Sequence, residues 1–153
     1  MGLDMYLEAE RFVWDSVEID PNAENLRNAV KNILGDIPGE VKTIITEAIY
    51  WCKANAIHKW FVDNIQDGVD ECQRSFVKRT QLQVLRDLCQ EVIDNPESAS
   101  TKLPVQSGFF FGDIDYTEWY FDDLTRTVEQ LDIILDEVKF PSIEWSFYYQ
   151  ASW

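Results

Sequence analysis

Residues 143–153 read IEWSFYYQASW, and this stretch decides the fold. Its odd-numbered positions, beginning with Ile143 and ending with Trp153, are apolar or aromatic, while most residues between them are polar. A period of two predicts a β-strand with one buried face. A strand with so apolar a face needs neighbours, so we expect it to complete a sheet.

The N-terminus shows the same alternation, with apolar residues at every odd position from Leu3 to Ala9, which predicts a second half-buried strand. Residues 41–51 fit two patterns, because their apolar residues recur at helical spacing while the run TIIT, residues 43–46, is β-branched. We interpret this segment as a strand, since β-branched residues pack well in sheets. Residues 74–78 predict one more short strand.

Capping residues and helical spacing predict four helices. The first opens after Asp20-Pro21 and ends at Gly35, and the second opens at Asn55 and ends at Gln66-Asp67-Gly68. The third opens at the capping box Thr80-Gln81-Leu82-Gln83 and ends before Asn95. The last opens at Asp115 and ends near Val138, because Pro141 stops it. Residues 95–100 read as a surface loop.

These elements predict an α+β fold, in which a small, mostly antiparallel sheet carries about four helices on one face. A length of 153 residues suits a single domain, 1–153. The three cysteines are widely spaced and odd in number, which argues against a disulfide framework and for a reducing compartment. The first residues do not resemble a signal peptide, and no apolar run reaches the length of a membrane span, so we expect a cytoplasmic protein.

The net charge is −15, from 28 acidic and 13 basic residues, although 46% of the chain is hydrophobic. The chain is therefore a folded acidic domain and not an acidic disordered tail. Such a charge repels nucleic acid and anionic membranes, so we expect the protein to bind neither directly. It attracts basic protein surfaces, including those that hold DNA or RNA.

The last predicted helix concentrates this charge. At about 100° per residue, its acids form a stripe beside the apolar face, and the predicted partner-binding residues are Asp115, Glu118, Asp122, Asp123, Glu129, Asp132 and Asp136. Carboxylates three and four residues apart lie about 5–6 Å from each other, comparable with phosphates along a nucleic-acid strand. The stripe therefore predicts a phosphate-backbone mimic; the alternative is a solvated helix face.

Aromatic segments around residues 50–61 and 103–112 suggest a ligand pocket. Its predicted residues are Trp51, Lys53, Asn55, His58, Lys59, Gln106, Ser107, Phe110, Trp119 and Tyr120. Cations near a helix N-terminus can receive an anion, and bases stack on aromatic rings. The alternative is that the aromatic residues are core and the lysines pair with nearby carboxylates. No enzyme motif or metal-ligand spacing occurs in the chain, so we predict no catalytic residue, metal or cofactor.

Five segments also carry a family resemblance, namely MGLDMYL at residues 1–7, residues 50–61, QSGFFFG at 106–112, EWY at 118–120 and YYQASW at 148–153. On these segments the chain resembles an uncharacterised family of small proteins encoded by bacteriophages and prophages. The resemblance implies a gene that acts in the bacterial host cytoplasm, and it brings no known activity or cofactor. By analogy, small acidic phage accessory proteins resemble inhibitors of host defence.

The leading hypothesis is therefore a phage-encoded, non-enzymatic protein that binds a host nucleic-acid-binding defence factor through the basic groove of that factor, as an anti-CRISPR or anti-restriction protein would. The alternative is a small-molecule binder that sequesters a nucleotide immune signal in the aromatic pocket. The sequence also leaves a homodimer open, because a C-terminal strand at a sheet edge would pair with a second copy.

Overall fold

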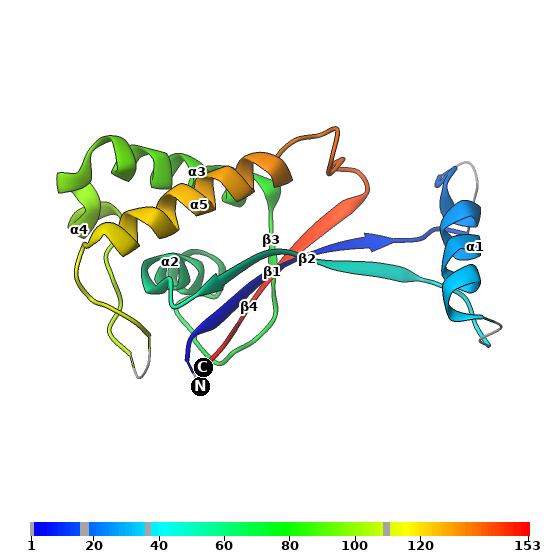
Figure 1. Cartoon of the computed structure of the whole chain (residues 1–153), viewed down its shortest axis with the longest axis horizontal. Coiled ribbons are helices and arrows are strands. Elements are labelled where there is room, and N and C mark those ends of the chain that lie inside the picture. The colour runs from blue at the N-terminus through cyan, green and yellow to red at the C-terminus, as the bar shows by residue number, and fades with distance from the viewer. Residues whose placement is uncertain (1, 16–18, 36–37, 109–110) are drawn as a thin grey trace.

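The computed structural model describes residues 2–15, 19–35, 38–108 and 111–153. The strands are β1 (Asp4–Phe12), β2 (Thr43–Cys52), β3 (Ser75–Val77) and β4 (Trp145–Ser152). The helices are α1 (Ala23–Leu34), α2 (Asn55–Ile65), α3 (Arg79–Asp94), α4 (Ala99–Lys102) and α5 (Glu118–Ile134), with a 3-10 turn η1 (Pro96–Ser98) before α4. Figure 1 shows their arrangement.

The strands form one antiparallel sheet in the order β2-β1-β4-β3, which confirms the α+β prediction. The two strands with the clearest alternation, β1 and β4, lie in the middle and pair from Asp4↔Ser152 to Arg11↔Trp145. The chain ends therefore lie side by side (Figure 1). Over Phe147–Tyr149, β4 has a neighbour on both sides, so the C-terminal strand is an inner strand there and not the sheet edge that we considered for a homodimer. The homodimer itself stays a prediction.

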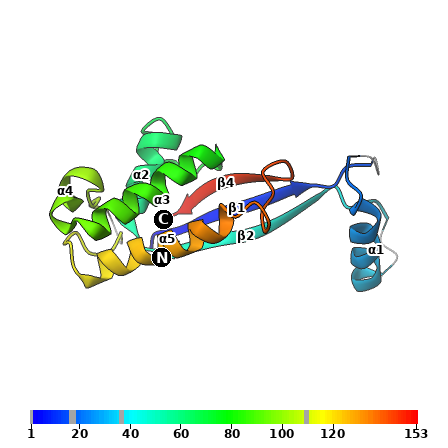
Figure 2. The same ribbon diagram turned by 90° about the horizontal axis from the view of Figure 1, so that it is seen from above.

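The core lies on one face of the sheet. Leu3 and the odd-numbered residues of β1 and β4, from Met5 to Ala9 and from Phe147 to Ala151, are buried in one core with side chains of α2, α3 and α5. Helices α3 and α5 run side by side in both views (Figures 1 and 2). The even-numbered residues of the same strands point to the opposite face, where no helix packs in the described part of the chain.

Helix α1 lies apart from this core. The β1–β2 hairpin extends beyond β4, and α1 sits at its far end, remote from the other helices (Figures 1 and 2). We expected α1 to pack on the sheet, yet the last residues of its apolar face are exposed, with Ile33 81% accessible. The predicted stop is confirmed: Gly35 takes a φ of +76°, and its N–H donates to the Lys31 carbonyl.

Several predicted element ends are wrong. Asn55 is the first residue of α2 and not its cap, because its side chain bonds to a loop elsewhere. Helix α3 starts at Arg79, where the Gln81 side chain accepts from the Lys78 N–H. Residues 95–100 form η1 and the start of α4 instead of a loop. Helix α5 ends at Ile134, so the predicted face residue Val138 is 89% exposed.

One buried hydrogen-bond chain fixes α5 on the sheet. The Trp51 Nε1–H of β2 donates to Thr127 Oγ1 at 2.9 Å, and that hydroxyl donates to the Asp123 carbonyl at 2.6 Å. Both side chains are buried. The indole donor therefore has its hydrogen-bond partner inside the core.

We expect Thr127→Val to lower the free energy of unfolding by about 1–3 kcal/mol, because it leaves the buried Trp51 N–H without an acceptor. Urea denaturation measures this change. Thr125→Val is the matched control, since the exposed Thr125 hydroxyl donates to the carbonyl four residues earlier in the same way. Equal losses in the two variants would contradict the proposed role of the Trp51 bond.

Candidate functional site

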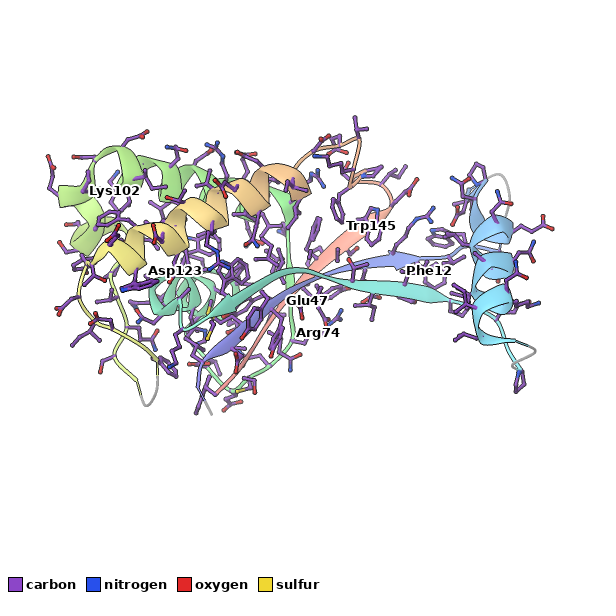
Figure 3. All side chains as sticks on the ribbon, in the orientation of Figure 1. Phe12, Glu47, Arg74, Lys102, Asp123 and Trp145 are labelled. Carbon is purple, nitrogen blue, oxygen red and sulfur yellow. The ribbon has the colours of Figure 1, made fainter. Side chains whose placement is uncertain are left out.

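A cleft of about 560 Å³ lies where the β2–α2 connection, the loop before α5 and the first turns of α5 meet. Its walls come from residues 52–57, from parts of residues 105–117 and from α5 up to Glu129. Figure 3 shows Asp123 on the side of α5 that faces α2. The cleft therefore joins two segments that are distant in the sequence, the β2–α2 connection and the loop that leads into α5.

Asn55 holds the loop wall of the cleft in place. Its Nδ2 donates to the carbonyls of Phe111 and Asp113 at 3.1 and 2.8 Å, and its Oδ1 accepts from the Gln106 N–H at 3.0 Å. Gly112 permits the close approach, since it has a φ of +96° and a Cβ there would lie 3.1 Å from the Lys53 Cβ and carbonyl. The loop at residues 106–113 is thus held against the β2–α2 connection and forms one wall of the cleft.

Five carboxylates line this acidic cleft, those of Asp113, Asp115, Asp122, Asp123 and Glu129. The cations among its lining residues are Lys53 and Arg126, so acids outnumber bases by five to two. None of the ion pairs between described residues involves a residue of this cleft. Trp119, at the start of α5, is 76% exposed and also lines it. The site therefore offers negative charge beside an accessible aromatic ring.

Asp123 is the most perturbed acid of the cleft. Burial raises its pKa from 3.8 to about 6; Arg126 opposes this effect, and the charge of Asp122 adds to it. The carboxylate is thus held in an environment that disfavours its charge. A cation that entered the cleft would lower this pKa and release a proton.

We expect Asp123→Asn to raise the free energy of unfolding by about 1–2 kcal/mol at pH 7.5 and to change it little near pH 4. The folded-state pKa lies above the unfolded value, so ionisation costs stability as the pH rises from about 4 to 6. The amide avoids that cost. Thermal unfolding across this pH range measures the effect.

Asp122→Asn is the control for this experiment, because the Asp122 side chain is exposed on the same turn of α5. It removes the same charge, and because Asp122 is the smallest of the three influences on the Asp123 pKa, it should lower that pKa and shift the pH profile of stability only slightly. A pH-independent gain in Asp123→Asn would mean that burial does not govern its ionisation.

The structure divides the predicted acidic stripe. Asp115, Asp122, Asp123 and Glu129 line the cleft, and Glu118 is exposed outside it.

The two remaining acids of the stripe are bonded to groups outside the cleft. The carboxylate of Asp132 accepts from the Arg86 guanidinium at 2.7 and 3.2 Å, which lowers the Asp132 pKa. Asp136 lies beyond the end of α5, where its side chain accepts from the Val138 N–H. Four of the seven predicted acids thus line the cleft.

The predicted ligand-pocket residues are also divided. Lys53, Asn55, Trp119 and Tyr120 line the cleft, so the structure brings them together with the acids. Trp51 is buried and donates to the Thr127 hydroxyl, and Lys59 forms an ion pair with Asp63. Gln106 donates its backbone N–H to the Asn55 side chain, and Ser107 is exposed outside the cleft. Phe110 lies outside the described residues. The sequence patterns did not single out Arg126 as a cleft residue.

His58 belongs to the core and not to the cleft. It is fully buried; its Nδ1 lies 2.7 Å from the Tyr149 hydroxyl and its Nε2 lies 2.9 Å from the Asp70 carboxylate. Asp70 also accepts from the Trp153 Nε1–H at 3.0 Å. The Tyr149 ring is stacked on Phe61 with 3.8 Å between centroids. Both ring nitrogens of His58 are thus used inside the protein.

No protein-family model matches this sequence, and neither a curated protein nor a solved structure is significantly similar to it. In the described part of the chain, no three His, Cys, Asp or Glu side chains form a group that could hold a metal ion. No helix found there is long and apolar enough to cross a membrane.

Proposed function

We propose that this protein is a non-enzymatic binder of a basic protein surface of the kind that holds nucleic acid. Given the resemblance to phage-encoded proteins, the target class is a host defence factor, inhibited as by an anti-CRISPR or anti-restriction protein. One observation carries the proposal: the acidic cleft places five carboxylates against two cations, beside the exposed ring of Trp119, on a protein of net charge −15.

An arginine or lysine side chain of the partner suits this cleft. Its charge would meet carboxylates that have no ion-pair partner among the described residues, and Trp119 can stack on a cation. Glu118 and Asp122 extend the negative surface along α5. Their charge would occupy a groove that otherwise receives phosphates and would steer the encounter.

Sequestration of a nucleotide is the second candidate. In its favour, Lys53, Asn55, Trp119 and Tyr120 share one cavity, which offers a cation and aromatic rings. The five carboxylates around them oppose a phosphate group. His58 and Lys59, which would have strengthened the anion site, point elsewhere. Equilibrium dialysis against nucleotides tests this candidate, and retention of one of them would favour it.

A pull-down from a nuclease-treated bacterial lysate tests the main proposal. The baits are the wild-type protein, a cleft variant with Asp115→Asn, Asp122→Asn and Glu129→Gln, and a charge-matched variant with Glu24→Gln, Glu71→Gln and Glu97→Gln, three exposed acids outside the cleft. We expect a stoichiometric nucleic-acid-binding protein that the cleft variant fails to retain and that duplex DNA displaces. Equal retention by all three baits would contradict the role of the cleft.

A further inference from the structure

The face of the sheet opposite the helices is rich in aromatic and acidic side chains. Because β1 residues 4–12 alternate, its even positions and their pairing partners on β2 and β4 share this face. We call it the open face and define it by Tyr6, Glu8, Glu10, Glu47, Tyr50 and Tyr148. The acidic cleft lies on the helical side of the sheet, so the two surfaces are separate.

Arg74 shows how this face binds a guanidinium group. Its Nε donates to Glu8 and its Nη2 to Glu10, each at 2.8 Å. Its Cζ lies 3.7 Å from the centroid of the Tyr148 ring. Two carboxylates and a ring thus surround one cation, and the two carboxylates raise the pKa of Arg74 despite partial burial. This combination of a planar fork with a stacked ring suits arginine better than lysine.

A second set, consisting of one further carboxylate and two rings, lies beside the first. Tyr6 pairs with Tyr50 and Glu8 with Glu47 across β1 and β2, so these four side chains are neighbours on the open face. The Tyr6 and Tyr50 rings are 5.5 Å apart, and Tyr50 is 39% exposed. Glu8 connects the two sets, because it pairs with Glu47 in the register and accepts from Arg74; Figure 3 labels Glu47 and Arg74 over the middle of the sheet.

The second set contains one carboxylate, that of Glu47, whose charge a cation would offset. Glu8 and Glu47 are directly opposite in the register, and like charges in this position are destabilising. Arg74 bonds to Glu8 and Glu10, whereas Glu47 has no ion-pair partner among the described residues. Exposed apolar side chains flank the set, including Ile45 and Phe76. They would supply contact area for a protein partner.

We propose that the open face docks a protein segment through an arginine side chain, whose guanidinium binds Glu47 and stacks on Tyr50 as Arg74 binds Glu8 and stacks on Tyr148. The partner is thus an arginine-bearing protein surface, and lysine substitutes poorly for its arginine. This inference does not rest on the acidic cleft. It adds a second contact surface, on the other side of the sheet, with its own specificity.

Fluorescence anisotropy with labelled oligo-arginine and oligo-lysine peptides of equal length tests the inference at physiological ionic strength. We expect the wild-type protein to bind oligo-arginine at least about tenfold more tightly than oligo-lysine. Glu47→Gln with Tyr50→Leu should abolish this preference. Tyr50→Phe, which keeps the ring, should retain it.

The cleft variant with Asp115→Asn, Asp122→Asn and Glu129→Gln serves as the control. It should bind both peptides more weakly but keep the preference for arginine, so that failure of the cleft proposal and failure of this one are distinguishable. Absence of binding to wild type, equal affinity for the two peptides, or an unchanged preference in the Glu47 and Tyr50 double variant would each overturn the inference. A thermal melt of each variant excludes a folding defect.

Discussion

We expect His58→Ala to lower the free energy of unfolding by about 3–5 kcal/mol. For a chain of this size, that loss corresponds to a fall in Tm of about 6–20 °C. The substitution leaves a cavity in the core and removes the partner of the Tyr149 hydroxyl and of one Asp70 oxygen. Asp70 keeps its bond to Trp153. The C-terminal end of β4 and helix α2 would therefore lose one of their shared anchors.

Two further variants separate the parts of this effect. Tyr149→Phe removes the hydroxyl alone and should cost about 1–2 kcal/mol, because the His58 Nδ1 then has no partner. Lys59→Ala, next to His58 but on the exposed side of α2, loses only the ion pair to Asp63 and should cost about 0.5 kcal/mol or less. Thermal melts and urea titrations measure all three. Equal stability of His58→Ala and wild type would contradict the core role of His58.

This network also bears on whether His58 is a catalytic base. The order carboxylate, imidazole, hydroxyl is one that enzymes use, but here the hydroxyl belongs to Tyr149, which is fully buried and stacked on Phe61. No substrate atom reaches it in this arrangement. A loss of activity in His58→Ala would therefore report unfolding, and the stability measurement must accompany any functional assay of that variant.

The alternating strands were the most predictable part of the fold. In β1 and β4 one face is buried and the other is not, so apolar and polar residues alternate in the sequence with a period of two. In β2 a bulge places Glu47 opposite Glu8 and Ile49 opposite Leu7, which leaves Ala48 as an extra residue. The extra residue shifts the alternation by one position, and this shift explains why residues 41–51 also resembled a helix.

Contacts between distant segments account for what the sequence did not reveal. Arg86 of α3 binds Asp132 across 46 positions of sequence and removes it from the acidic stripe. Asn55 was expected to cap α2, but its amide instead holds the loop at residues 106–113. The helical period located acids along α5, but which of them reach the cleft depends on how α3 and the loop pack against the helix.

The prediction with the largest effect on binding concerns the acidic cleft. We expect Asp115→Asn, Asp122→Asn and Glu129→Gln together to weaken binding of the basic partner recovered in the pull-down by at least about 100-fold at physiological ionic strength. Each close charge pair at an interface contributes on the order of 1 kcal/mol or more, and about 2.8 kcal/mol corresponds to that factor. Isothermal titration calorimetry measures the affinity.

The charge-matched variant with Glu24→Gln, Glu71→Gln and Glu97→Gln has the same net charge but an intact cleft. We expect a several-fold loss in this variant, confined to the association rate, because the lost charges steer the encounter without touching the partner. If the two triple variants lose affinity equally, net charge and not the cleft governs binding.

A pH titration then identifies the cleft as the place where the cation binds. Because the pKa of Asp123 is raised to about 6 in the free protein, a bound cation lowers it, and complex formation near pH 6 releases a proton. Affinity should therefore fall as the pH drops from 7 towards 5. Asp123→Asn should lose this dependence, whereas Asp122→Asn should keep it. Affinity that is independent of pH in the wild-type protein would place the bound cation away from Asp123, outside the cleft.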